Sequence, residues 1–250
     1  MSDGIYAALS GAIASERSLD VVANNVANVG TDGFRGERLA FRESMAEASR
    51  DGSRPTTLRF TEIEESRIDL SEGPLRQTGN PLDLAISGDA FFVVQSQDGE
   101  RYTRAGSFVV GSNGLVTTRE GNPVLTEPVA TTGRRAQLVV APGTTSISVG
   151  SDGTLSAGDQ TMGRIGLVRF ERASDLVSAG GALYAARSGS TPTRATGASV
   201  VQGFLEGANV APIGGMNELI TASRTFDAFQ RVIQTFRTLD ERTARDLAKG

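Results

Sequence analysis

Apolar and small residues recur at alternating intervals of three and four over residues 3–29. These positions, which we call the N-terminal seam, are Ile5, Ala8, Ala12, Ser15, Leu19, Val22, Val26 and Val29. Such spacing is typical of the a and d positions of a coiled coil, which share one narrow side of an α-helix. At a rise of about 1.5 Å per residue, the segment predicts a helix roughly 40 Å long.

A similar pattern occupies residues 216–248 at the other end of the chain. Its C-terminal seam consists of Leu219, Ala222, Phe226, Phe229, Ile233 and Phe236. Pro212 and Gly214-Gly215 mark the expected start of this helix. Each helix could pack on the core of its own domain, but both seams are narrow and lie at opposite chain ends. We therefore expect the two helices to pair with each other in antiparallel orientation.

The residues between the helices, about 58–210, are rich in β-branched residues, Gly and turn signals. Short strands are predicted at residues 82–86, 91–94, 101–104, 108–110, 115–118, 124–126, 138–140, 147–149 and 165–170. Turns are predicted at Asp98-Gly99, Asn113-Gly114, Gly121-Asn122 and Asp152-Gly153. No long helical pattern separates these strands, which favours an antiparallel sandwich or irregular barrel.

The expected fold class is therefore α+β, with long terminal helices that pair as a coiled-coil-like element and an inserted antiparallel all-β domain. We expect four segments, which are an N-terminal helix at 1–35, a linker or extended arm at 36–75, a β-rich domain at 76–203 and a C-terminal helix at 204–250. The stretch 43–57 is polar and rich in small residues, which indicates a linker or exposed loop.

Composition excludes many kinds of chemistry. The 250 residues include no His, Cys or Trp, so the usual zinc, haem and iron–sulfur ligands and the Ser-His-Asp and Cys-His triads are excluded. Lys249, the one Lys, is too close to the C-terminus for a P-loop. A net charge of −4 argues against nucleic-acid binding, and apolar runs such as 91–94 are too short to span a membrane. We expect no cofactor, no metal and no enzymatic activity.

A carboxylate-dependent glycan hydrolase remains a remote alternative. Its candidate residues would be Glu62, Glu64, Glu65 and Asp69, and the spacing of Glu62 and Glu64 places them on one face of a strand. No aromatic platform for a sugar lies nearby in the sequence, so solvated surface charge is the better interpretation. A β adhesion module with a helical stalk is a second remote alternative.

Three Asn residues near the end of the first helix are unusual, because the Asn side chain competes for backbone hydrogen bonds. Asn24, Asn25 and Asn28 fall away from the seam. They could mark a fraying helix end before a turn at residues 31–33, or form a polar face that hydrogen-bonds neighbouring subunits. In the second case, Gly33 would supply the tight turn and Phe34 would dock the chain onto the next element.

The stretch SGAIASERSLDVVANNVANVGTDGFR at residues 10–35 closely resembles the N-terminal signature of flagellar basal-body rod and hook proteins. Gly30 departs from this signature, since many members have Asn there. Further blocks resemble the same family in the same order, namely GNPLDLAISGDAFFVV (79–94), YTRAGSF (102–108), VVQGFLEGANVAPIGGM (200–216) and NELITASRTFDAF (217–229). The length and the stretch GRIGLVRF (163–170) are most similar to members of the proximal rod, with the distal rod next.

The resemblance implies a structural axial subunit of the rod, with terminal helices in an inner tube, a β domain in an outer layer and a role in transmitting torque from motor to hook. A distal-rod or hook-type subunit is the alternative. The implied partners are further copies, other rod and hook axial proteins and the type III flagellar export apparatus. We expect a location in the periplasm-spanning rod, export without a cleaved signal peptide, and no nucleic-acid partner or membrane insertion.

The resemblance and the seams together suggest an assembly interface. Its expected residues are Ile5, Leu9, Ala12, Leu19, Val22, Asn24, Asn25, Val26, Asn28, Gly33, Phe34, Leu219, Phe226, Phe229, Ile233 and Phe236.

The small residues of the first helix offer little apolar area to offset an ordering cost of about 1–2 kcal/mol per residue. We therefore expect the terminal segments to be largely disordered in the dilute monomer and to fold on assembly. Limited proteolysis of dilute protein should leave a stable fragment near 60–205. Ends as resistant as the centre of the chain would contradict this expectation.

Overall fold

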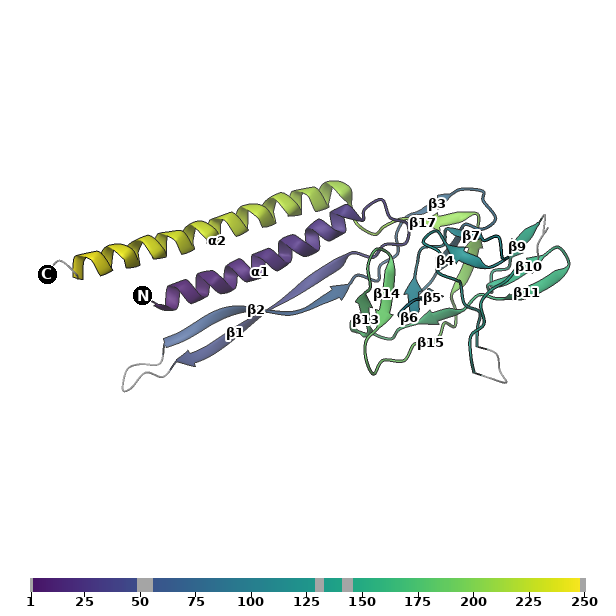
Figure 1. Ribbon diagram of the computed structural model, residues 1–250, viewed down its shortest axis with the longest axis horizontal. Coiled ribbons are helices and arrows are strands. Elements are labelled where there is room, and N and C mark those ends of the chain that lie inside the picture. Colours follow the sequence, from purple (N-terminus) through teal and green to yellow (C-terminus); the bar gives the residue numbers. More distant parts are fainter. Residues whose placement is uncertain (1, 49–55, 129–132, 141–145, 248–250) are drawn as a thin grey trace. The chain divides into compact units, whose positions relative to one another are not determined.

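The structure is a computed structural model and describes residues 2–48, 56–128, 133–140 and 146–247 (Figure 1). Lys249 and residues 49–55 of the predicted linker lie outside the described residues. The chain divides into two compact units. Unit 1 comprises Met1–Ala27, Glu37–Ser66 and Ala211–Gly250, and unit 2 comprises Asn28–Gly36 and Arg67–Val210. With two long helices and many antiparallel strands, the fold is α+β, as predicted.

Unit 1 contains both long helices, α1 (Ser2–Ala27) and α2 (Pro212–Leu247). Both helices were predicted, and α2 begins at Pro212, which was expected to mark its start. Pro suits the first turn of a helix because an N–H group there has no partner within the helix. Over the residues that the structure describes, no helix is both long and apolar enough to cross a membrane.

Two long strands in unit 1 were not predicted. They are β1 (Glu37–Ala48) and β2 (Thr56–Ile68), which pair as a two-stranded sheet within the segment expected to be a linker or extended arm. The stretch 43–57 was interpreted as a linker or exposed loop, but its described residues, 43–48 and 56–57, belong to these strands. Alternation of polar and apolar residues was present there, but the high content of charged residues concealed it.

Unit 2 is built from short antiparallel strands. Ahead of the middle of the chain these are β3 (Leu75–Gln77), β4 (Leu84–Ser87), β5 (Phe91–Ser96), β6 (Gly99–Thr103), β7 (Phe108–Val110) and β8 (Val116–Thr118). After it come β9 (Ile147–Val149), β10 (Thr154–Ala157), β11 (Gln160–Arg164), β12 (Leu167–Arg169), β13 (Leu176–Ser178), β14 (Leu183–Ala186), β15 (Thr193–Arg194), β16 (Ser199–Gln202) and β17 (Phe204–Glu206). The largest sheet has the order β13-β14-β6-β5-β12-β15.

Strand β5 lies at the centre of unit 2 and is buried on both faces. Successive side chains of a strand point to opposite faces. Phe92 and Val94 therefore enter one apolar cluster, while Phe91 and Val93 enter a second. Phe92 packs edge-on against Phe108, with ring centroids 5.1 Å apart. This explains why the sequence has a continuous apolar run here rather than an alternating one.

Most of the predicted strands are present, but two of them are not regular. Residues 124–126 and 138–140 are joined to neighbours by isolated bridges, such as Val94 with Val124 and Leu125 with Gln137. The hairpin of β10 and β11 was not predicted, because its residues are mostly polar or small. All four predicted turns contain a glycine with positive φ, namely Gly99, Gly114, Gly121 and Gly153.

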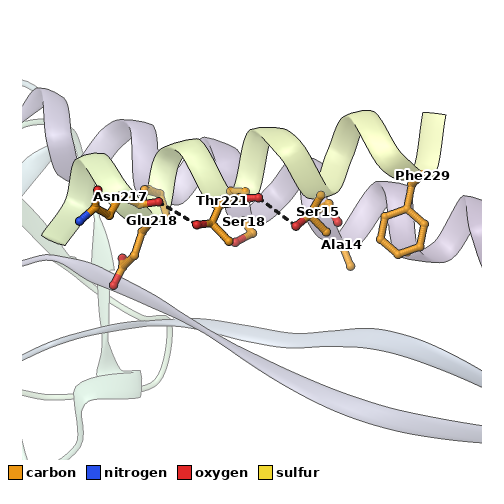
Figure 2. A pocket seen from close by; sticks show the side chains of 11 residues that line it. Ala14, Ser15, Ser18, Asn217, Glu218, Thr221 and Phe229 are labelled. Carbon is orange, nitrogen blue, oxygen red and sulfur yellow. Dashed lines mark hydrogen bonds between the residues drawn. The ribbon is translucent and has the colours of Figure 1, made fainter. Parts of the chain in front are cut away.

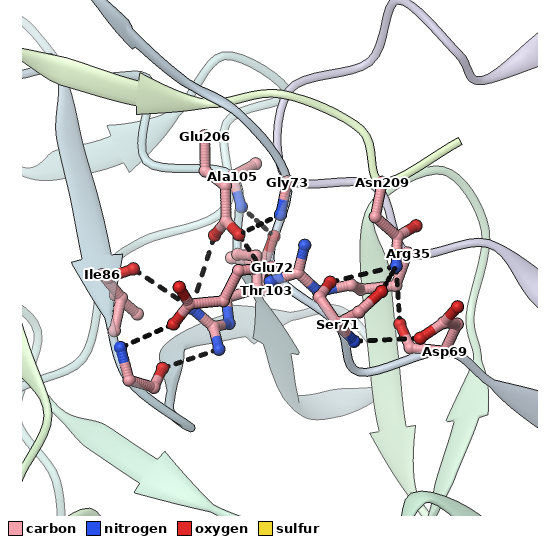
Figure 3. Close-up of polar contacts among 12 residues, drawn as sticks. Arg35, Asp69, Ser71, Glu72, Gly73, Ile86, Thr103, Ala105, Glu206 and Asn209 are labelled. Atoms are coloured by element: carbon pink, nitrogen blue, oxygen red, sulfur yellow. Dashed lines mark hydrogen bonds and ion pairs between the residues drawn. The ribbon is translucent and has the colours of Figure 1, made fainter. Parts of the chain in front are cut away.

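A buried carboxylate organises the polar interior of unit 2. The side chain of Glu206 is fully buried, and its Oε1 lies 2.6 Å from Nη2 of Arg35. Its Oε2 lies 3.3 Å from Nη1 of Arg104, which is also buried. The backbone N–H of Gly73 donates to Glu206 Oε1 at 2.9 Å (Figure 3). Burial lowers the pKa of Arg104, whereas Glu206 acts to raise it.

These contacts fix the two segments of unit 2 that adjoin the helices. The N–H of Gly33 donates to the backbone oxygen of Glu206 at 2.7 Å, and the N–H of Arg35 donates to the hydroxyl of Tyr184 at 2.8 Å. The Asn209 amide accepts from the N–H of Gly36 at 2.7 Å. Residues 28–36, which follow α1, are thus held beside residues 204–209, which precede α2.

Replacing Glu206 with Ala would leave two buried guanidinium groups without their carboxylate. We expect a loss of about 3–5 kcal/mol in the free energy of unfolding of unit 2. The measurement is urea denaturation followed by tyrosine fluorescence, because Tyr102 and Tyr184 lie in its core. The control is Glu120→Ala at an exposed position, with an expected change below about 0.5 kcal/mol. Equal losses in both variants would contradict the role of Glu206.

Candidate assembly interface

The helices of unit 1 lie side by side and run in opposite directions (Figure 1). Two glycines of α1 allow aromatic rings of α2 to approach its backbone. A Cβ atom at Gly11 would lie 2.4 Å from Cε1 of Phe229, and one at Gly4 would lie 2.9 Å from Cζ of Phe236. The contacts advance seven residues along α1 as they retreat seven along α2, which fixes the antiparallel register.

Burial along α2 follows the spacing of the C-terminal seam. All six of its residues, including the predicted interface residues Leu219, Phe226, Phe229, Ile233 and Phe236, are half-buried. Other residues between 211 and 242 are exposed, apart from the buried Gly215. One narrow side of α2 therefore faces α1, and the rest of its circumference is open.

Burial along α1 is concentrated at small residues. Ala8, Ala12, Ala14 and Ser15 are buried. The larger seam residues Ile5, Leu19, Val22 and Val26 are half-buried. Leu9 differs from the other predicted apolar interface residues of the helices, because its side chain is 47% exposed.

The Asn residues have distinct environments. The Asn25 amide pairs with β1, since its Nδ2 donates to the backbone oxygen of Glu37 at 2.8 Å and its Oδ1 accepts from the Glu37 N–H at 2.9 Å. Asn25 thus substitutes for a neighbouring strand at the start of β1. Asn28 accepts from Thr31, whose backbone N–H donates to the Asn28 backbone oxygen at 3.0 Å. Asn24 is exposed on α1.

The last two predicted interface residues are buried within unit 2. Gly33 has a φ of 70°, as expected for a tight turn, and a Cβ there would lie 2.1 Å from the backbone nitrogen of Ala105. Phe34 is only 2% exposed. Both residues therefore pack inside their own chain, within unit 2.

A groove runs along one side of the helix pair and has a volume of about 600 Å³. Its lining residues are Gly11, Ala14, Ser15, Ser18, Val22, Asn217, Glu218, Thr221, Ala222, Thr225 and Phe229 (Figure 2). The hydroxyl of Thr221 donates to the backbone oxygen of Asn217, and that of Thr225 to the oxygen of Thr221, both at 2.9 Å. These two hydroxyl groups therefore bond within α2, and the Phe229 ring and the methyl groups of Ala14 and Ala222 give the groove apolar surface.

The remaining candidate chemistry finds little support. Among the described residues, no group of three or more acidic, His or Cys side chains could hold a metal ion. The side chains of Glu62, Glu64 and Glu65 lie outside the described residues, although their backbone belongs to β2. The Asp69 carboxylate accepts from the backbone N–H of Ser71 at 3.0 Å, which is a local turn contact.

The residues that join segment 28–36 to segment 204–209 were not predicted from the sequence. Glu206 and Asn209 lie in the block QGFLEGANV, which was used for its resemblance rather than for its chemistry. The signal that could have revealed them is a single acidic residue within an apolar strand, because a buried carboxylate requires a cationic partner. Arg35 and Arg104 could not be chosen from 24 Arg residues by pattern alone.

Three segments of the chain match known protein families. Residues 5–35 match the family described as flagella basal body rod protein. Residues 85–157 match the D1 domain of the flagellar hook protein FlgE/F/G, and residues 201–246 match the C-terminal domain of the flagellar basal body rod FlgEFG proteins. The chain is also 35% identical over its full length to the flagellar basal-body rod protein FlgF of Caulobacter vibrioides, covering 99% of that protein. The chain belongs to the flagellar basal-body rod family.

Other relatives locate the chain within this family. The FlgF protein of Mesorhizobium japonicum is 34% identical over 91% of the chain and 90% of its own length. The FlgG protein of Bacillus subtilis is 31% identical over 94% of the chain and 95% of its own length. The protein is therefore FlgF-like, and the family resemblance predicted from its sequence is confirmed.

Gly11 provides a test of the helix pair. In Gly11→Val, the added carbon atoms would displace the Phe229 ring, and overpacking of this kind costs about 1–3 kcal/mol. We expect the amount of protein in isolated basal bodies to fall about 10-fold, measured by immunoblot against total cellular protein. Gly30→Val is the matched control, because a Cβ at Gly30 has no atom within 4 Å. Equal incorporation of both variants would show that close packing at Gly11 is unimportant.

Proposed function

We propose that this flagellar basal-body rod protein is an axial subunit of the proximal rod that helps to transmit torque from motor to hook. The full-length similarity to FlgF proteins is the observation that carries the proposal. Membership of a structural family implies a non-enzymatic role. It therefore supports neither of the two remote alternatives, the glycan hydrolase and the adhesion module.

The terminal helices are the proposed means of polymerisation. α2 buries only its seam, so most of its surface remains available to neighbouring subunits. Exposed apolar side chains occur on both helices, including Leu9, Ile13 and Ile220. We propose that the helices form a coiled-coil-like inner layer in the assembled rod, with unit 2 outside. A head-to-tail contact that does not close on itself would produce the required open polymer.

The proposed partners are further copies of the chain and other rod and hook axial proteins. Delivery would use the type III flagellar export apparatus, without a cleaved signal peptide, and the site of action would be the basal body. Of the sixteen predicted interface residues, we retain those on α1 and α2, apart from Asn25, as candidates for contacts that form or strengthen on assembly. Asn25, Gly33 and Phe34 have intramolecular partners that would orient the rest.

A distal-rod subunit is the second candidate. The observation that favours it is the similarity to FlgG proteins over almost the whole chain. The two candidates differ in position along the rod rather than in chemistry. Electron microscopy of basal bodies from a deletion strain distinguishes them, because loss of a proximal subunit stops the rod nearer to the motor.

Charged residues in the seams should prevent assembly without unfolding unit 2. We expect Val26→Asp, Phe229→Asp and Phe236→Asp to be absent from isolated basal bodies, because each places a carboxylate in an apolar contact. Their urea-unfolding transition by tyrosine fluorescence should match that of the unaltered protein. Ser223→Asp, at an exposed position of α2, is the control. Normal incorporation of the seam variants would refute assembly through the helices.

A further inference from the structure

A row of large apolar side chains on α1 is exposed over the part of the chain that the structure describes. Tyr6, Leu9 and Ile13 are 59%, 47% and 51% exposed, and their spacing of three and four places them on one side of the helix. We call these three residues the outer stripe. Single exposed apolar residues are common on protein surfaces, but a row with an aromatic member is typical of an interaction site.

The outer stripe and the groove lie on different sides of the same helix. At about 100° per residue, the stripe is roughly 150° around α1 from the groove residues Gly11, Ala14 and Ser18. A chain therefore cannot place its stripe in its own groove. One molecule therefore carries both an exposed apolar row and a groove with apolar surface.

We propose that the outer stripe of one copy occupies the groove of the next copy of this chain. The proposal rests on the proposed function and identifies the residues that would join like subunits. A contact between two different surfaces of the same chain leaves one surface free at each end, so it extends into an open polymer. The groove volume of about 600 Å³ lies within the range of sites that receive apolar groups.

The charges of Arg17 and Glu218 favour a second copy of the chain as the occupant of the groove. Successive subunits of a polar polymer point the same way, so α1 of the next copy would also run antiparallel to α2. With Leu9 of that copy level with Thr225, its Arg17 comes within about 3 Å, along the axis, of Glu218 at the rim. Arg17 lies on the side of α1 that carries the stripe, and both Arg17 and Glu218 are exposed. Opposite charges at this position would set the register of the contact.

The contact is small, and this also favours a polymer over a dimer. A stable interface usually buries about 800 Å² per partner, which three side chains cannot supply. A copy inside a polymer makes the contact twice, once with its stripe and once with its groove. The contact would therefore persist in the assembled rod and dissociate in dilute solution.

Disulfide cross-linking in basal bodies tests the proposal, because the chain has no Cys of its own. In the double variant Leu9→Cys and Thr225→Cys, every copy can join two neighbours, so oxidation should give a ladder of covalent multimers. The matched control pairs Leu9→Cys with Ser223→Cys, an exposed position of α2 outside the groove, and should give no ladder. Similar ladders in both variants, or none in the first, would overturn the proposal.

Other outcomes identify other occupants. A dimer from Leu9→Cys alone would mean that two outer stripes meet, and a cross-link of a different mass would mean that another axial protein fills the groove. Either result overturns the proposal while leaving the proposed function intact. Absence of the unaltered protein from basal bodies would instead refute the proposed function and this inference with it.

Exchanging the charges of residues 17 and 218 gives a second test, because these substitutions leave the apolar residues of the contact unchanged. Arg17→Glu and Glu218→Arg should each lower incorporation into basal bodies a few-fold, since both place like charges together at the rim. The variant with both changes should recover normal incorporation, because residue 17 of one copy then meets residue 218 of the next with opposite charge. No recovery in the double variant would contradict the register.

Discussion

The buried carboxylate of Glu206 is the contact on which the organisation of the chain depends. It neutralises Arg35 after the first helix and Arg104 at the end of β6, and its own backbone oxygen holds Gly33. An ion pair removed from water contributes little net stability, but it strongly penalises arrangements that separate its members. The contact therefore acts mainly by specifying where the segments that adjoin the two helices lie within unit 2.

The two units of the chain are stabilised by different interactions. Unit 2 relies on apolar burial around β5 and on the buried ion pairs of Glu206, which suits a domain that is folded by itself. The helices of unit 1 expose most of their surface, and small residues allow aromatic rings to approach the α1 backbone closely. Such a helix pair gains little from burial within one chain and has much to gain from neighbours. This division fits a structural subunit that carries an assembly surface on a stable domain.

Regular spacing explains what the sequence could predict. The six seam positions of α2 match its half-buried residues, because residues spaced three and four apart lie on one side of an α-helix. Strand β5 itself was predictable from its apolar run. Contacts distant in sequence were not, since Arg35 and Glu206 are 171 residues apart and no local pattern joins them. Phe34 was expected to dock the chain onto the next element and was also included in the assembly interface, and it packs inside unit 2.

Those distant contacts also determine how the chain acquires its structure. Strand β17 pairs with β3, and the hydroxyl of Tyr184 binds the N–H of Arg35 across 149 residues. Closing loops of this length costs entropy before any contact compensates for it, so domains with many distant pairings fold slowly. Because residues 204–209 complete unit 2 late in synthesis, the nascent chain cannot finish this domain until almost all of it has been made. We expect the protein to remain unfolded for an extended period after synthesis, which would favour the delivery proposed through the type III export apparatus.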